Sequence, residues 1–486
     1  MNRCAPSDLA DALNLKPDAD VVVGMFEGPQ RARGGRGADL VNRVLGIDLD
    51  EIALAAGGFD ATSGTRESVL VAGPDRPVRV TLVGLGRRAG PGELFEAALA
   101  SGNDRAVIST LALEAPDALG AVAQGHSIGG WRYQRRSDAP ATPPAVELVD
   151  DSDSIADSVL ARAAIVARAT GWVRQLVETP PNMLGTKAFA DSIVDFAREL
   201  APQSVTVEQW DAATLAQHGF GGTLGVGAGS SQPPLAVALK IAGDGAMTAL
   251  AGKGITFDSG GVNLKRGLGE LSWMKSDMAA AAAVAAAVIA AGALDASGPV
   301  TAILPIAENM PSGTALRPGD VLTHPGGRTT EVLDTDSEGR IVLADALGYL
   351  AAQKPSRLID VGTLTDSGGV GHCFWGCWTT STELARDVVS AGERAFDRGW
   401  ALPLHSSYAA LLSSRVADIA NSPTAVPDSG QLAATYLRSF VGDVPWVHID
   451  NGSSAWLEEA AHPWPAGATG TPVRALIEFL APGTSC

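Results

Sequence analysis

Short apolar runs alternate along the chain with longer segments whose apolar residues recur at helical spacing. A run rich in aliphatic residues and bounded by polar or turn residues predicts a buried strand, and residues 21–25 and 78–83 are of this kind. Further strands are expected at residues 205–209, 235–242, 247–257, 300–305 and 357–364, and helices at 154–177, 276–291 and 341–353. Such alternation predicts the α/β class, with mixed sheets flanked by helices.

The composition changes between residues 137 and 154, where the run Ala-Pro-Ala-Thr-Pro-Pro is followed by Val-Asp-Asp-Ser-Asp-Ser. Proline and small polar residues favour a linker or a long loop. At 486 residues the chain is also too long for one ordinary core, because a domain usually holds roughly 100–200 residues. We therefore expect two domains, an amino-terminal α/β domain at residues 1–150 and a second domain at 151–486 that carries the functional site.

The formal net charge of −18 narrows the range of partners. An acidic surface repels the phosphates of nucleic acids and of anionic membranes, so neither is expected as a partner. The alanine-rich run 278–291 is the most apolar stretch, yet it is shorter than the ~20 residues that a membrane-spanning helix needs. A buried helix is expected there instead.

Cysteine usage and the first residues of the chain bear on its compartment. The cysteines, Cys4, Cys373, Cys377 and Cys486, form no recognisable disulfide framework. The first residues lack a basic region followed by an apolar run, so no secretory signal is expected. Both features predict a cytoplasmic location.

One glycine-rich segment places charged side chains at the end of an expected strand. Lys253, Asp258 and Lys265 lie between residues 252 and 265, where glycines allow the backbone to approach a ligand closely. Ligands commonly bind at strand ends in open α/β sheets. A phosphate-binding P-loop is excluded, because Gly254 rather than Ser or Thr follows Lys253 and the upstream glycine spacing is wrong.

A second polar segment runs from Asp334 to Arg340. In an extended chain, residues two apart share a face, so Asp336, Glu338 and Arg340 can point into one cavity. Two carboxylates on one face repel each other unless a cation lies between them, and oxygen ligands suit Mg, Mn or Zn. On spacing alone, a charged loop in water is the commoner explanation. Likewise Asp277, which opens the alanine-rich helix, is explained on its own by helix capping or by the helix dipole.

Together these segments resemble the leucine aminopeptidase family, whose members are also called cytosol aminopeptidases. The family pattern Lys, four residues, Asp-Ser-Gly-Gly, three residues, Lys is present at 253–265, and Met-Lys-x-Asp-Met at 274–278. The signature Asn-Thr-Asp-Ala-Glu-Gly-Arg is present at 334–340, with Asp334 in place of Asn and Ser337 in place of Ala. Further matches lie at 178–182, 308–313, 317–321 and 467–474. The resemblance covers roughly residues 165–482 and is specific, because separate motifs occur in the family order.

The resemblance implies a metal-dependent aminopeptidase whose catalytic domain, residues 151–486, binds two divalent metal ions, Mn or Zn. A metal-bridging hydroxide would attack the peptide bond after the N-terminal residue of a peptide substrate. The amino-terminal domain would have no catalytic role. By the family pattern, Asp258 and Glu338 would bridge the two ions, and the full set of metal ligands would be Lys253, Asp258, Asp277, Asp336 and Glu338.

Other residues take roles from the same resemblance. Lys265 would stay cationic and stabilise the oxyanion of the tetrahedral intermediate. Arg340 would hold a bicarbonate ion that serves as general base, since a guanidinium suits a planar anion. Thr363 and Leu364 would line the substrate pocket. Asp366 stands there in place of a family glycine, so we expect altered specificity, with more tolerance of basic or polar N-terminal residues.

The resemblance also predicts how the chain assembles and leaves two alternative functions open. The family assembles as a hexamer, a dimer of trimers, and a homo-hexamer is expected here. The first alternative is a protein of the same fold that has lost catalysis and serves as a scaffold or DNA-binding regulator. The second is a related dipeptidase that acts on cysteinylglycine. Metal content and hydrolysis of aminoacyl amides distinguish the first, and a comparison of dipeptides with longer peptides distinguishes the second.

Overall fold

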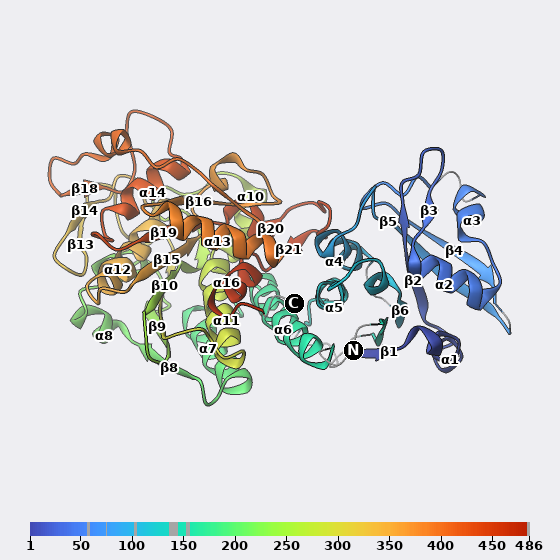
Figure 1. Ribbon diagram of the computed structural model, residues 1–486. Helices are drawn as coiled ribbons and strands as arrows, with labels where there is room; N and C mark the ends of the chain where they lie inside the picture. Colours follow the sequence, from blue (N-terminus) through green and yellow to red (C-terminus); the bar gives the residue numbers. More distant parts are fainter. Residues whose placement is uncertain (56–58, 74, 102–104, 136–143, 152–155, 484–486) are drawn as a thin grey trace. The chain divides into compact units, whose positions relative to one another are not determined.

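The computed structural model describes residues 1–55, 59–73, 75–101, 105–135, 144–151 and 156–483. The chain forms two compact units. The first consists of Met1–Gly171 and Ala460–Pro465, and the second of Trp172–Glu459 and Ala466–Thr484. Each is built on a mixed sheet with helices packed against it, so the predicted α/β class is confirmed (Figure 1).

The sheet of the first unit has the strand order β1-β7-β6-β2-β5-β4, with β3 paired to β2. Its strands are β1 (Asn2–Cys4), β2 (Asp20–Phe26), β3 (Arg33–Gly34), β4 (Arg66–Ala72), β5 (Pro77–Gly84), β6 (Val107–Ser109) and β7 (Val146–Val149). β2 is covered on both faces, because Val21 and Val23 belong to one core cluster and Val22 to another. A central strand buried on both faces requires a continuous apolar run, which is why the sequence predicts β2 correctly.

Helices supply part of both core clusters, together with other strands of the sheet. They are α1 (Leu9–Leu15), α2 (Arg36–Leu45), α3 (Leu49–Ala55), α4 (Pro91–Ala100) and α5 (Leu119–Gly129). Residues of α1, α2 and α3 pack into the cluster that contains Val21, whereas residues of α4 and α5 pack into the cluster that contains Val22. The sheet of the first unit is therefore enclosed between two helical layers.

β7 corrects the prediction that residues 137–154 form a linker or a long loop. Val146 and Leu148 are buried on either side of Glu147, and the strand pairs in parallel with β1 and β6. The alternation of apolar and polar residues in β7 is too short to predict a strand against the prolines that precede it. Residues 136–143 and 152–155 of the predicted linker lie outside the described residues.

The sheet of the second unit has the order β17-β16-β19-β15-β10-β12-β9-β8, with β11 also paired to β12. Its strands are β8 (Val205–Trp210), β9 (Leu235–Ile241), β10 (Thr248–Gly252), β11 (Gly254–Asp258), β12 (Val300–Asn309), β15 (Arg357–Gly362), β16 (Trp375–Thr379), β17 (Gly399–Ala401) and β19 (Trp446–Asp450). The central strands β19, β15, β10 and β12 are mutually parallel. Their carboxyl ends therefore meet at one edge of the sheet.

Helices pack on both sides of these central strands (Figure 1). Those that contact the central strands are α7 (Thr186–Leu200), α9 (Gly221–Gly227), α11 (Ala279–Ala293), α12 (Glu338–Ala351), α13 (Thr382–Arg394) and α14 (Gly430–Arg438). The second unit also contains α8 (Ala212–Gln217), α10 (Leu268–Trp273), α15 (Gly452–Ala455) and α16 (Val473–Leu480), whereas α6 (Ala156–Glu178) belongs to the first unit as far as Gly171. Two small sheets are formed by β13 (Val321–Thr323), β14 (Thr329–Glu331) and β18 (Ile419–Ala420), and by β20 (Trp456–Leu457) and β21 (Gly467–Ala468).

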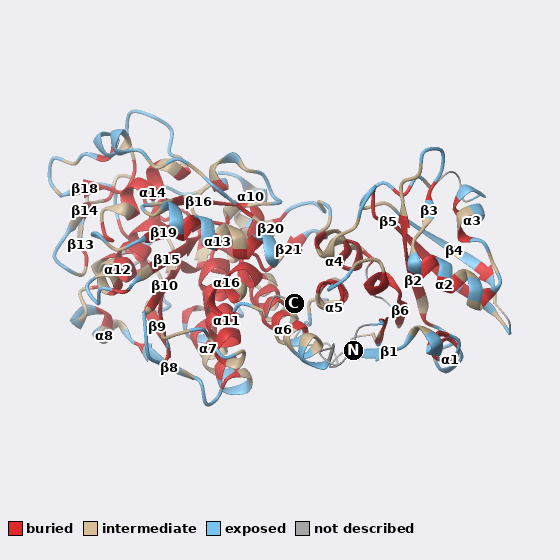
Figure 2. Ribbon diagram, in the orientation of Figure 1, coloured by how far each residue is buried: buried red, intermediate tan, exposed pale blue. Residues whose placement is uncertain are grey.

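The alanine-rich run forms α11, as predicted, and every residue of that helix up to Gly292 is buried (Figure 2). The stretch Gly269–Ala293 has the length and apolar character of a membrane-spanning helix, but 94% of its most apolar window is buried inside the protein. Alanine side chains allow the helix to lie close to its neighbours, which include β10 and α16. α11 is thus the tightly packed central helix that the sequence indicates.

The expected single strand at residues 247–257 is instead two strands, β10 and β11, separated by Lys253. Both pair in parallel with β12. At the break, the backbone N–H of Ala281 in α11 donates to the carbonyl of Lys253 (2.9 Å). Gly252 permits this approach, because a Cβ there would lie 2.7 Å from the Cα of Ala281. Long-range packing on α11, which the local apolar pattern does not record, therefore fixes the position of Lys253.

Candidate metal centre

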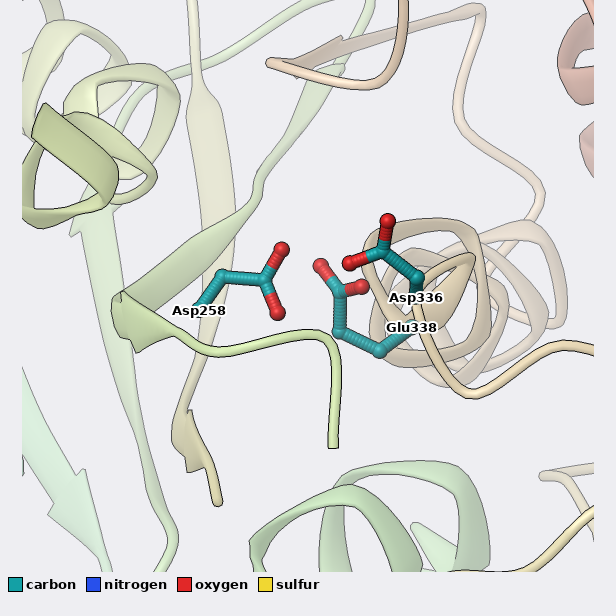
Figure 3. A group of neighbouring side chains, drawn as sticks. All are labelled: Asp258, Asp336 and Glu338. Atoms are coloured by element: carbon teal, nitrogen blue, oxygen red, sulfur yellow. The ribbon is translucent and has the colours of Figure 1, made fainter. Parts of the chain in front are cut away.

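Three carboxylates from distant segments converge at the carboxyl edge of the central strands. Asp258 is the last residue of β11, Glu338 is the first residue of α12, and Asp336 lies two positions before it. One oxygen from each carboxylate lies within 4.8 Å of the others (Figure 3). The sequence predicts all of them as metal ligands, and the structure brings them together.

Lys253 and Asp277 extend this group on its other side. The ammonium of Lys253 lies 2.8 Å from Asp277 Oδ1 and 2.9 Å from Glu338 Oε1, and it donates to the carbonyl of Thr363 (2.9 Å). The Lys253 side chain is only 4% exposed. Gly339 makes room for it, because a Cβ there would lie 2.4 Å from Lys253 Cε. The five predicted ligands therefore form one continuous cluster.

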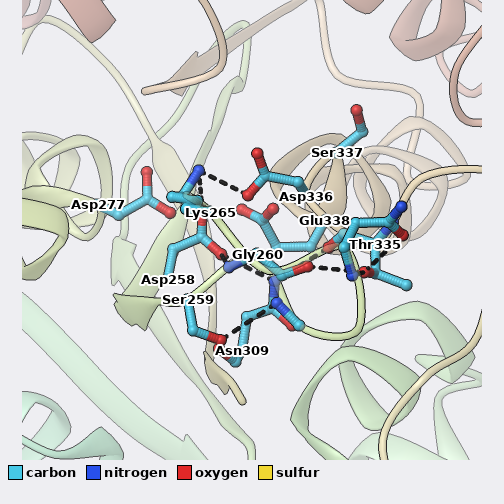
Figure 4. Close-up of polar contacts among 12 residues, drawn as sticks. Asp258, Ser259, Gly260, Lys265, Asp277, Asn309, Thr335, Asp336, Ser337 and Glu338 are labelled. Carbon is cyan, nitrogen blue, oxygen red and sulfur yellow. Dashed lines mark hydrogen bonds and ion pairs between the residues drawn. The ribbon is translucent and has the colours of Figure 1, made fainter. Parts of the chain in front are cut away.

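Lys265 closes the cluster from the opposite side. Its ammonium lies 3.0 Å from Asp258 Oδ2 and 2.6 Å from Asp336 Oδ1 (Figure 4). The side chain is 10% exposed, so this amine remains closer to solvent than that of Lys253. Two lysines thus face the carboxylates, and Lys253 is more deeply buried than Lys265.

Asn309 and Thr335 hold the carboxylate-bearing segments in place. The amide of Asn309, at the end of β12, donates to Asp258 Oδ1 (2.8 Å) and to the carbonyl of Thr335 (3.0 Å). The Thr335 hydroxyl in turn donates to the carbonyl of Gly260 (2.7 Å). Gly260 has a φ of +85°, and a Cβ there would lie 2.8 Å from Asp336 Oδ1. The sequence gives no sign of either supporting role beyond the place of each residue within a family motif.

Burial and mutual repulsion set the protonation of this cluster. Burial, reinforced by neighbouring carboxylates, raises the pKa of Asp277 and of Glu338. Burial and then the charges of Asp258 and Glu338 raise the pKa of Asp336 to about 7. Burial alone would lower the pKa of Lys253, but Asp277, Glu338 and Asp258 outweigh it and raise that pKa. When all groups are ionised, the four carboxylates of the cluster carry more negative charge than the two lysines balance.

Unpaired oxygens show that the cluster suits a cation. Within the described part of the chain, Asp277 Oδ2 and Glu338 Oε2 are buried and accept no hydrogen bond. A buried carboxylate oxygen without a donor is costly unless positive charge lies beside it. Carboxylate oxygens are also the ligands that hard divalent cations prefer. The residues present therefore fit a divalent metal ion.

Arg340 lies in the first turn of α12 and is buried, but it meets a different partner from the one expected. Its Nη1 donates to the carbonyl of Asn421 (2.8 Å) and to Asp428 Oδ1 (3.2 Å), and its Nη2 donates to Asp428 Oδ2 (2.6 Å). Arg340, the residue to which the resemblance assigns a bicarbonate ion, thus contacts a carboxylate of the chain itself. Both terminal nitrogens of the guanidinium therefore have acceptors within the chain.

The predicted substrate residues are placed differently from one another. The Thr363 hydroxyl donates to Asp277 Oδ1 (2.7 Å), so Thr363 adjoins the cluster. The backbone N–H of Leu364 donates to Asp450 Oδ1 (3.3 Å), and its side chain packs on the main core of the second unit. Asp366 caps a short 3-10 turn by accepting from the N–H of Gly368 (3.1 Å). Its carboxylate is therefore engaged in the local structure of this turn.

Comparison with known proteins agrees with this geometry. The sequence model of the cytosol aminopeptidase family, catalytic domain, matches residues 171–477. A probable cytosol aminopeptidase of Micrococcus luteus is 40% identical over 399 residues, which cover 77% of each chain. One of Rhodococcus opacus is 37% identical over 499 residues, which cover 97% of this chain and 96% of the relative.

Solved structures show the same relationship. The bottromycin maturation enzyme BotP is 34% identical, with a TM-score of 0.81, over 96% of this chain and 99% of its own. The same enzyme in complex with Mn gives a TM-score of 0.82 at the same identity. Neither a scaffold or DNA-binding regulator nor a cysteinylglycine dipeptidase is favoured by these matches. The chain belongs to the cytosol aminopeptidase family, a family of metal-dependent aminopeptidases.

Proposed function

We propose that this aminopeptidase works through two divalent metal ions, Mn or Zn, held by Lys253, Asp258, Asp277, Asp336 and Glu338. The observation that carries the proposal is the convergence of these side chains, all of them buried except the half-buried Asp336, with carboxylate oxygens left unpaired. Two divalent ions would offset the four carboxylates. When bound, such a pair supplies an activated water near neutral pH and polarises the scissile carbonyl.

The lysines have separate tasks in this proposal. Lys253 can bind a metal only as a neutral amine, and in the absence of metal its charge instead balances Asp277 and Glu338. Lys265 stays cationic, because the carboxylates around it raise its pKa against the effect of burial. Its ammonium is placed to stabilise negative charge that develops on the carbonyl oxygen of the substrate.

Peptides are the substrate class, and Thr363, Leu364 and Asp366 are the residues proposed to meet them. Thr363 links the substrate side to the cluster through Asp277. Asp366 introduces a carboxylate at the exposed turn that follows β15. We therefore propose more tolerance of basic or polar N-terminal residues than a plain leucine preference allows. A panel of aminoacyl amides in which leucine is plainly preferred contradicts this part.

Assembly and location follow from the resemblance and remain part of the proposal. The protein is proposed to be a cytoplasmic homo-hexamer that acts without nucleic acid or membrane. Light scattering coupled to size-exclusion chromatography tests the hexamer, and a monomer in solution contradicts it.

A metal-dependent substrate scan tests the main proposal. The purified protein is depleted with a chelator, reloaded with Mn or Zn, and assayed on aminoacyl amides, dipeptides and longer peptides. Activity should depend on metal, with about two ions bound per chain. Glu338→Ala should lose activity and bound metal. Glu331→Ala is a matched control, because Glu331 lies in β14 and accepts from Ser414 instead.

Outcomes that contradict the main proposal distinguish between the alternative functions. Stable metal binding without hydrolysis of any peptide supports the scaffold, and hydrolysis of dipeptides alone supports the dipeptidase. A protein that stays empty in Mn and Zn rules out the proposed centre.

A further inference from the structure

The contact between Arg340 and Asp428 departs from the expected site chemistry. Both terminal nitrogens of the guanidinium reach the carboxylate, at 3.2 Å and 2.6 Å, in a two-pronged arrangement. The Arg340 side chain is only 2% exposed, while that of Asp428 is 27% exposed. Paired hydrogen bonds of this kind are the strongest way for a guanidinium to hold an anion.

Asp428 is itself held in position by further contacts. The backbone N–H of Ser429 donates to Asp428 Oδ1 (2.8 Å), and the hydroxyl of Ser337 donates to Oδ2 (3.2 Å). Ser337 stands between two proposed metal ligands, Asp336 and Glu338. The carboxylate therefore joins the segment before α14 to the segment that carries the metal ligands.

Charge balance argues against a second anion on the same guanidinium. A buried cation needs one compensating charge, and Asp428 supplies it. Nη1 donates to Asp428 Oδ1 and to the carbonyl of Asn421, which uses both of its N–H groups. Nε of Arg340 has no partner among the described residues, but it is buried. An added anion would also meet repulsion from Asp428 and from the nearby carboxylate cluster.

We propose that Asp428 is the built-in anion of Arg340, so that this enzyme takes no separate bicarbonate ion at that guanidinium. The inference rests on the proposed function for its catalytic consequence but not for the binding site itself. Asp428 is a positioning residue, which acts by fixing Arg340 and Ser337 beside Asp336 and Glu338. Removing its side chain leaves a vacant guanidinium of the right shape for a small carboxylate.

Small anions test the proposal by rescue. Activity is measured in carbonate-free buffer with and without added bicarbonate or formate. The unaltered enzyme should show the same rate in each. Asp428→Ala should lose about 10–100-fold of its activity, as expected for a partner that orients a site, and should recover in bicarbonate or formate. Asp428→Asn keeps the volume without the charge, so it should lose activity and not recover.

A matched variant and a binding measurement make the test independent of catalysis. Asp443→Ala, at an exposed position after α14, should behave like the unaltered enzyme in every arm. Binding of ¹³C-labelled bicarbonate to the metal-loaded protein is followed by NMR, and each protein is compared with its own Arg340→Met form. Binding that depends on Arg340 should be present in Asp428→Ala and absent in the unaltered enzyme.

Two results would overturn the inference. One is stimulation of the unaltered enzyme by bicarbonate together with bicarbonate binding that depends on Arg340. The other is full activity of Asp428→Ala in carbonate-free buffer. If neither the unaltered enzyme nor any variant hydrolyses peptides, the proposed function fails. The binding measurement still decides whether Asp428 occupies the anion site of Arg340.

Discussion

Each unit places a glutamate at the start of a helix, and the two glutamates have opposite surroundings. In the first unit, Glu114 accepts from the backbone N–H groups of Arg36 and Gly37 at the start of α2, at 3.0 Å and 2.8 Å. In the second unit, Glu338 opens α12, and its Oε2 has no donor among the described residues. A carboxylate that the chain satisfies supports the fold, whereas one that the chain leaves unsatisfied is available to a ligand.

The largest expected contrast is in kcat/KM, between the substitution of one lysine in each unit. Lys265→Met should reduce kcat/KM by about 10²–10³-fold, the usual effect of removing one group that stabilises an oxyanion. Lys16→Met in the first unit, where Lys16 pairs with Glu147, should leave kcat/KM unchanged. Steady-state kinetics on one aminoacyl amide measures both. Equal losses in the two variants would show that Lys265 acts only through stability.

Metal removal should destabilise the second unit and leave the stability of the first unchanged. Ligand at about 100–1,000 times its Kd stabilises the state that binds it by about 2.7–4.1 kcal/mol. Chelation should therefore speed hydrogen exchange in β10 and β11 and leave exchange in β2 and β5 nearly unchanged. Mass spectrometry of peptides from both sheets measures the difference. Uniform acceleration in both units would mean that the centre is not confined to the second.

Matched glutamine substitutions should change stability in opposite directions in the metal-free protein. Glu114→Gln should lower the free energy of unfolding by about 1–3 kcal/mol, because the N–H groups of Arg36 and Gly37 each use one carboxylate oxygen and an amide supplies only one. This loss outweighs the relief of removing a charge whose burial raises the pKa of Glu114. Glu338→Gln should raise it, because one of several clustered negative charges disappears. Urea denaturation of both variants measures the change, and a shared sign contradicts the comparison.

The smallest expected contrast is in the pH dependence of stability. Burial lowers the pKa of His126 in the first unit to about 3 from 6.5, so the unfolded state takes up protons first as the pH falls. Between pH 6.5 and roughly 5.5, the first unit should lose about 1 kcal/mol. The raised pKa of Asp336, about 7, has the opposite sign, since the folded metal-free state takes up the proton first. His126→Gln should flatten the slope in the first unit alone, as measured by hydrogen exchange at several pH values.

Sequence reasoning reached the fold class and the cluster because both depend on strong local signals. The apolar run at β2 and the alanine run at α11 each specify a buried element directly. The carboxylates that converge were identified through motifs whose order along the chain is distinctive. For these carboxylates, the structure adds only that their segments lie together in the fold.

What sequence reasoning missed depends on contacts between distant residues. The break at Lys253 comes from packing against α11, and β7 is defined by its neighbours β1 and β6 more than by its own composition. Asp428 lies 88 positions from Arg340 in a segment without a recognisable motif. No local pattern could have shown that this carboxylate pairs with Arg340.

The crowding of α11 has a consequence for how the enzyme can be altered. Asp277 lies two positions before this helix, whose residues from Ala280 to Ala291 have no solvent exposure. One extra methyl group in the helix has no free space to enter, so the helix itself must shift and carry Asp277 with it. Laboratory evolution for new metal preferences can therefore select changes inside a helix that touches neither substrate nor ion.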